Sequence, residues 1–76
     1  MTLNGGMNIT LHACQRFMER VFKNNEPTKD ELRRTAHLLS QEIGATMLMN
    51  GRYTLPSFDG YVFVVHDGSV VTVRKK

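Results

Sequence analysis

The chain has 76 residues, of which 41% are hydrophobic and 22% charged, and its formal net charge is +3. A chain of this length forms one domain with a thin core, because it buries only about 60% of the surface that its unfolded form exposes. It contains no apolar run of the roughly 18 residues that a membrane span needs, so we expect no membrane partner. The single cysteine, Cys14, excludes an internal disulfide, and residues 1–6 lack the features of a signal peptide. Together these observations predict a cytoplasmic protein.

The positive charge is concentrated at the C-terminus. Arg74, Lys75 and Lys76 carry as much charge as the whole net +3, so the rest of the chain is neutral. A basic tail of this kind can contact phosphate, but it can equally keep the chain soluble. The net charge is therefore weak support for a nucleic-acid partner.

The N-terminal part begins with residues 1–6, where Asn4-Gly5-Gly6 predicts a disordered end. Residues 7–10 alternate in polarity and predict a short edge strand. An amphipathic helix follows over residues 10–23, with Thr10 as its N-cap. The side chains of this helix divide into an apolar side (Leu11, Cys14, Phe17, Met18, Val21, Phe22) and a polar side (His12, Arg16, Glu19, Arg20, Lys23).

A second helix is indicated by the capping-box pattern of Thr28 and Glu31. Gly44 is well placed to end it. Its apolar stripe is made of Leu32, Ala36, Leu39 and Ile43 and is broadened by Leu38. Because the link between the two helices is short, we expect an antiparallel helical hairpin over residues 7–44, together with the edge strand.

From residue 45 the hydrophobic period changes to two, which predicts strands. Asn50-Gly51 lies between strand patterns at 46–49 and 52–55, and Asp67-Gly68 lies between patterns at 61–66 and 69–74. Each dipeptide is typical of a two-residue hairpin turn. The sequence therefore predicts a single α+β domain over 1–76, with two N-terminal helices packed on one face of a four-stranded antiparallel sheet at 45–74.

Hairpin register predicts which residues share a face of this sheet. Around Asp67-Gly68, Val64 would pair with Val71 and Val62 with Val73, giving a valine core face. The opposite, open face would collect Arg52, Thr54, Tyr61, Phe63, Thr72 and Arg74. Aromatic and basic side chains of this kind suit stacking of bases and contact with phosphates. The candidate nucleic-acid-binding residues are Arg52, Tyr61, Phe63, Arg74, Lys75 and Lys76. Half-buried sheets also carry such residues on both faces for packing alone, and that alternative stays open.

Two motifs carry a resemblance to a known group. The first helix reads H-A-x-x-R-F-x-E-R from His12, and the last strand reads D-G-x-V-V-T-V from Asp67. Over residues 7–74 the chain resembles small bacterial and phage proteins related to the RelE and colicin-type ribonuclease toxins. The resemblance implies helices on a small antiparallel sheet, RNA cleavage without a metal, and restraint of the toxin by an antitoxin. It also implies catalytic roles for His12, Arg16, Arg20 and Thr72.

These residue types suit the implied chemistry. Metal-independent cleavage uses the 2′-hydroxyl of the RNA as the nucleophile, and histidine is suited to the proton transfers. Arginine's fork of donors suits the oxygens of the phosphorane. His12 also lies in the first helical turn, where free N–H groups favour an anion. The expected packing raises a difficulty, however, because burial of the apolar side of the helix points His12 and Arg16 away from Thr72.

Other chemistries are less favoured. His12, His37 and His66 lack the paired spacing of metal ligands, and Cys14 is expected in the core, so we predict neither a metal nor a cofactor. The second functional hypothesis is a non-catalytic phage or bacterial interaction module that binds a host protein or a nucleic acid. An open sheet edge can accept a partner strand in such a module. The sequence leaves the oligomeric state open.

Overall fold

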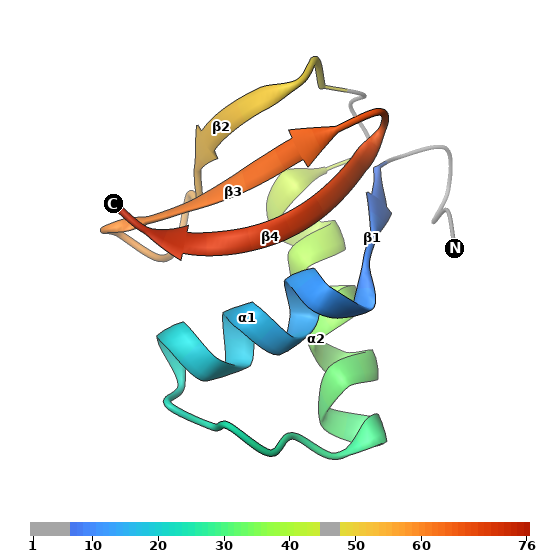
Figure 1. The fold of residues 1–76 in the computed structure, drawn as a ribbon, viewed down its shortest axis with the longest axis vertical. Helices are drawn as coiled ribbons and strands as arrows, with labels where there is room; N and C mark the ends of the chain where they lie inside the picture. Colours follow the sequence, from blue (N-terminus) through green and yellow to red (C-terminus); the bar gives the residue numbers. More distant parts are fainter. Residues whose placement is uncertain (1–6, 45–47) are drawn as a thin grey trace.

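A computed structural model describes residues 7–44 and 48–76 of the chain. In this part the elements follow the order β1 (Asn8–Ile9), α1 (Leu11–Val21), α2 (Lys29–Ile43), β2 (Gly51–Thr54), β3 (Tyr61–His66) and β4 (Ser69–Lys75). The strands form one mixed sheet in the order β1-β4-β3-β2; in the view of Figure 1, α1 lies below β4 and the upper end of α2 rises behind the sheet. The predicted α+β class is confirmed. Residues 1–6, predicted to be disordered, lie outside the described residues.

The edge strand predicted at residues 7–10 is β1, but its partner makes the sheet mixed. Asn8 and Ile9 pair in parallel with Ser69 and Val70 of β4, so the prediction of a purely antiparallel sheet is wrong. The backbone N–H of Thr10 donates to the carbonyl of Val70 at 3.1 Å, and its hydroxyl donates to the same oxygen at 2.9 Å. These bonds fix the start of α1 to β4.

Helix α1 begins where the sequence predicts. The Thr10 hydroxyl accepts a hydrogen bond from the N–H of Ala13 at 3.1 Å, which makes Thr10 the N-cap. The helix ends at Val21, earlier than predicted. Lys23 adopts a left-handed conformation with φ 58°, and the N–H of Asn24 donates back to the carbonyl of Met18 at 3.0 Å.

Helix α2 carries the predicted capping box. The N–H of Glu31 donates to the Thr28 hydroxyl at 3.2 Å, and the Glu31 carboxylate accepts from the N–H of Thr28 at 2.8 Å. The hydrogen bond from the Thr28 backbone N–H is the main cause that lowers the pKa of Glu31, because it favours the ionised carboxylate. Gly44 ends the helix with φ 82°, as predicted.

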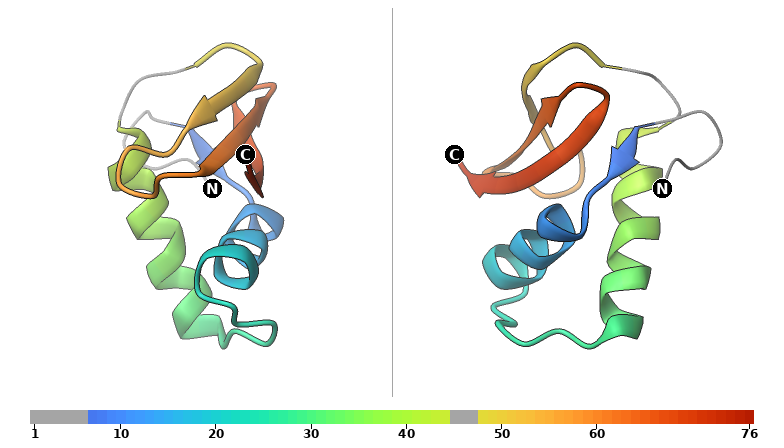
Figure 2. Two further views of the ribbon diagram at one scale, coloured as in Figure 1. Left: turned by 90° about the vertical axis from the view of Figure 1, so that its left-hand side faces the viewer. Right: turned by 45° about the vertical axis from the view of Figure 1, so that its right-hand side comes forward.

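The packing of the two helices differs from the expected arrangement. Helix α1 packs on β4, whereas α2 packs mainly against α1 and touches β1. In Figure 1 and in both views of Figure 2, α1 lies inclined beside α2, and the connection joins them at the end of the molecule away from the sheet. The buried side chains of α1 are Ala13, Cys14, Phe17 and Met18. Helix α1 is therefore the element that covers the inner face of the sheet at β4.

The first predicted hairpin, around Asn50-Gly51, is wrong for the described residues. Leu48 and Met49 are not in a strand, and residues 46 and 47 lie outside the description. Strand β2 starts at Gly51 and pairs antiparallel with β3. The Asn50 side-chain oxygen instead accepts a hydrogen bond from the N–H of Asp67 at 2.8 Å. Asn50 thus bonds to the Asp67-Gly68 turn, and Asn50-Gly51 does not form a hairpin turn itself.

The second predicted hairpin is confirmed, but its register is not. Asp67 and Gly68 have φ values of 50° and 78°, as a type I′ turn requires, and Val65 pairs with Val70. A β-bulge between Val64 and Val65 then shifts the pairing by one residue. As a result Val64 pairs with Thr72 and Val62 with Arg74, instead of the predicted Val71 and Val73.

The inner face of the sheet also differs from the predicted valine face. Its buried residues are Phe63, Val65, Val70 and Val73, each at most 3% exposed. Burial of a phenylalanine removes more apolar area from water than burial of a valine, and an aromatic side chain buries about 150–250 Å². Tyr53 adds to this face by stacking on Phe63, with ring centroids 5.5 Å apart.

The outer face follows from the same pairing and the alternation of side chains along strands. One row across three strands is Arg52, Val64 and Thr72, and the next is Thr54, Val62 and Arg74. Four of the six residues predicted for the open face are therefore on it. Tyr61 and Phe63 are not, because they alternate with Val62 and Val64 and lie on the inner face.

Candidate active site

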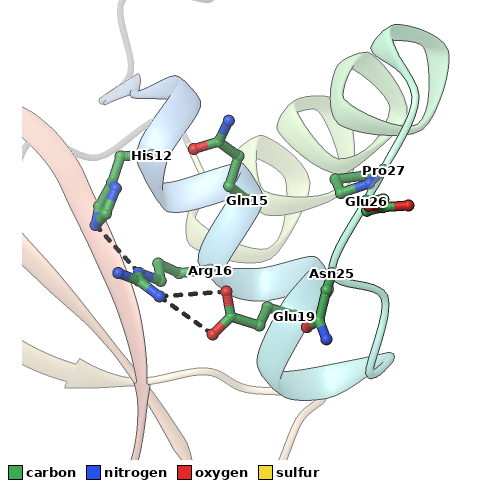
Figure 3. A pocket seen from close by; sticks show the side chains of 7 residues that line it. All are labelled: His12, Gln15, Arg16, Glu19, Asn25, Glu26 and Pro27. Atoms are coloured by element: carbon green, nitrogen blue, oxygen red, sulfur yellow. Dashed lines mark hydrogen bonds and ion pairs between the residues drawn. The ribbon is translucent and has the colours of Figure 1, made fainter.

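A polar hollow of about 470 Å³ lies beside α1. Its lining comes from two segments, which are one side of the helix (His12, Gln15, Arg16, Glu19) and the connection to α2 (Asn25, Glu26, Pro27). Figure 3 shows His12, Arg16 and Glu19 along α1, joined by dashed contacts, and Asn25, Glu26 and Pro27 on the connection to α2. Two of the four predicted catalytic residues, His12 and Arg16, are thus brought together.

His12, Arg16 and Glu19 form a chain of polar contacts. The Nε of Arg16 donates to the Nε2 of His12 at 3.4 Å, and its Nη1 donates to both carboxylate oxygens of Glu19 at 3.1 and 3.2 Å. Spacings of four and three residues place all three side chains on one helix face. With the guanidinium as the donor, Nε2 of His12 is the acceptor of this contact. The cluster thus combines a proton acceptor with a cation.

Arg20 lies outside this cluster. It does not line the hollow, and its Nε atom is buried with no hydrogen-bond partner among the described residues. Its carbonyl accepts a hydrogen bond from the Tyr61 hydroxyl at 3.0 Å. This bond ties the last turn of α1 to the start of β3, which is a structural contact rather than a reactive one.

Thr72 is also separated from the hollow. It pairs with Val64 on the outer face of the sheet, while α1 packs on the inner side of β4. The difficulty expected from the sequence is therefore present. His12 and Arg16 share a site, and Thr72 lies on another surface.

The predicted nucleic-acid-binding residues also lie on two different surfaces of the molecule. Arg52 and Arg74 are exposed on the outer face, and Lys75 and Lys76 are exposed at the end of β4. Phe63 is 3% exposed in the core, and Tyr61 is half-buried on the inner face. The prediction that these two rings lie on the open face, where bases could stack on them, is therefore wrong.

Sequence reasoning missed the acidic members of the hollow. Glu19 was assigned to the polar side of the helix, but its ion pair with Arg16 was not anticipated, although their three-residue spacing could have indicated it. Asn25, Glu26 and Pro27 gave no such signal, because the path of the connection decides what they line.

Other reactive groups are limited in the described part of the chain. Cys14 is 2% exposed, and burial raises the pKa of its thiol, so the uncharged form is favoured. Among residues 7–44 and 48–76 no three His, Cys, Asp or Glu side chains lie close enough together to hold a metal ion. Neither α1 nor α2 is long and apolar enough to cross a membrane.

Comparison with known proteins gives no relative. No family model matches the chain, and neither does any curated protein or solved structure.

Proposed function

We propose that this chain is a small endoribonuclease that cleaves RNA phosphodiesters without a metal, with His12 and Arg16 as the reacting pair. The observation that carries the proposal is the contact between His12 Nε2 and Arg16 Nε, 3.4 Å apart at the wall of a hollow. A proton acceptor beside a guanidinium is the minimal set for this reaction. The resemblance of the helix motif to RelE and colicin-type toxins supports the same assignment.

The reaction balances with groups that this site offers. Nε2 of His12 takes the proton of the 2′-hydroxyl, and the 2′-oxygen attacks phosphorus. The new bond from phosphorus to the 2′-oxygen forms as the bond to the 5′-oxygen breaks. The departing 5′-oxygen takes a proton from water in the open hollow. The hydroxide that remains takes the proton from Nε2 of His12, which restores the base. The products are a 2′,3′-cyclic phosphate and a 5′-hydroxyl, and Arg16 balances the charge on the phosphorane.

Arg16 must exchange partners for this to occur. Its contact with His12, at 3.4 Å, is longer than the roughly 2.7–3.2 Å of a good N–H hydrogen bond and is therefore easily released. Its ion pair with Glu19 joins side chains that are 36% and 40% exposed. Exposed ion pairs of this kind contribute about 0–1 kcal/mol, whereas two parallel hydrogen bonds from arginine to a phosphate are stronger. A phosphate can therefore displace Glu19.

The test is cleavage of a single-stranded RNA oligonucleotide by the purified protein in the presence of a chelator. We expect products that end in a 2′,3′-cyclic phosphate. His12→Ala should lower the rate by about 10²–10⁴, the usual contribution of a general base. His37→Ala is the matched control, because His37 is likewise an exposed helical histidine but lies on α2. For Arg16 the control is Arg33→Ala, since Arg33 forms a similar ion pair with Asp30.

Two results would contradict the proposal. One is intact RNA after incubation with folded wild-type protein, and the other is equal cleavage by wild type and His12→Ala. RNA that is bound but not cut would favour the alternative, a non-catalytic interaction module. Induced expression in a bacterial host gives a second readout, since growth arrest by wild type and not by a His12→Ala, Arg16→Ala double variant at equal soluble levels is expected.

A further inference from the structure

A second hollow, of about 340 Å³, lies between the start of α1 and the first half of α2. Its apolar lining includes Ile9 of β1, Leu11 of α1, and Leu32 and Ala36 of α2. Leu11 is 61% exposed, so most of its side chain is open to contact by a partner. Leu32 and Ala36, four residues apart, line the α2 side of this groove, and Ile9 and Leu11 line the other side.

The rim of this groove is basic. Lys29 and Arg33 also line it, and both are exposed. At about 100° per residue they follow Leu32 and Ala36 around α2, so they border the apolar floor on one side. Arg33 has a carboxylate partner, Asp30, at 3.4 Å, but both side chains are about three-quarters exposed, at 75% and 74%. Asp30 lies farther around the helix and does not line the groove.

We infer that this groove, defined by Ile9, Leu11, Leu32, Ala36, Lys29 and Arg33, binds an acidic amphipathic helix from a partner protein. The apolar face of such a helix would cover Leu11 and Leu32, and its acidic flank would meet Lys29 and Arg33. This is the helix-in-groove mode, in which apolar anchors recur every three or four residues. Charge complementarity selects an acidic partner over a basic one. The groove does not include His12 or Arg16, so the inference is independent of the proposed cleavage of RNA.

The probes are two synthetic helical peptides with the same leucine positions. One has glutamate and the other lysine at every remaining position that can face the rim. Binding is measured by fluorescence anisotropy at low ionic strength and located by chemical-shift changes in the protein. We expect the acidic peptide to bind at least about tenfold more tightly than the basic one, because like charges at the rim oppose the latter. The double variant Lys29→Glu, Arg33→Glu should reverse that order.

Single substitutions distinguish binding in the groove from non-specific hydrophobic binding. Leu11→Ser should weaken binding of both peptides without unfolding the protein, because Leu11 is largely exposed. Met49→Ser is the matched control, since Met49 is 83% exposed and does not line this groove. Equal binding of the two peptides, no binding, or shift changes away from Leu32 and Ala36 would each overturn the inference. His12→Ala should bind the acidic peptide as wild type does, whatever it does to RNA.

Discussion

The two faces of the sheet use neighbouring residues of one strand for different purposes. Val65 is 2% exposed on the inner face under α1, whereas Val64 is only partly buried on the outer face, to which no described element is packed. The outer rows also hold Arg52, Thr72 and Arg74. Since both faces contain valines, composition does not say which is inside. The inner face is defined by Phe63 and by the bulge that brings Val70 and Val73 to the same side.

The inner face should account for much of the stability. A domain of this size is stable by roughly 4–11 kcal/mol. Phe63→Ala should cost about 3–5 kcal/mol, because it opens a cavity beneath Tyr53 and α1. Chemical denaturation monitored by circular dichroism measures this loss. A change below about 1 kcal/mol would show that Phe63 is not a central core residue.

The two adjacent valines provide a sharper test of the faces. Val65→Thr places a hydroxyl in the core and should cost about 1–3 kcal/mol in unfolding free energy. Val64→Thr changes the same shape on the outer face and should stay within about 0.5 kcal/mol. Because threonine and valine have nearly the same volume, the pair isolates burial from packing. The reverse order would restore the register predicted from the sequence, with Val64 inside.

The starts of both helices were predictable because capping is local. Each cap joins a side chain to a backbone group three residues away, at Thr10 for α1 and at Thr28 and Glu31 for α2. A short stretch of sequence therefore contains every residue of the capping interaction. The Asp67-Gly68 turn is local in the same sense. Its two positive φ values are those that this dipeptide favours.

The errors concern contacts between distant residues. The parallel pairing of β1 depends on bonds between Thr10 and Val70, some 60 residues apart, and no local pattern indicates it. Asn50-Gly51 has the composition of a hairpin turn, yet Asn50 bonds to Asp67 on another turn. The bulge at Val64 and Val65 has no side-chain signature, but it shifts every later pair of β4. The bulge thus places Val73 on the same face as Phe63 and Val65, whereas the predicted register separated them.

In the candidate site, too, local features could be predicted and long-range ones could not. The contact of His12 with Arg16 follows from a spacing of four residues on one helix, and the sequence placed both residues on the polar side of that helix without predicting the contact itself. The separation of Thr72 from that pair depends on which side of β4 meets α1. The burial of Phe63 depends on the register of β3. Both required the fold.

The smallest expected change in stability belongs to the two arginines of the outer face. If this face contacts the RNA backbone, Arg52→Ala with Arg74→Ala should weaken binding of single-stranded RNA in a salt-dependent way. Each phosphate contact on a single strand contributes about −0.7 to the slope of log affinity against log salt, so losing two contacts should flatten the slope by about 1.4. The unfolding free energy should change by less than about 0.5 kcal/mol per substitution.

This measurement uses the His12→Ala protein, so that the RNA stays intact, and its control is Arg33→Ala with Arg34→Ala on α2. The control removes the same charge from a surface away from the sheet, so it separates local contacts from the effect of net charge. Equal slopes for the two double variants would mean that the outer face is not the RNA surface. A flatter slope in the sheet variant alone, at unchanged stability, would mean that the inner face supports the fold while the outer face binds RNA through phosphate rather than by stacking of bases.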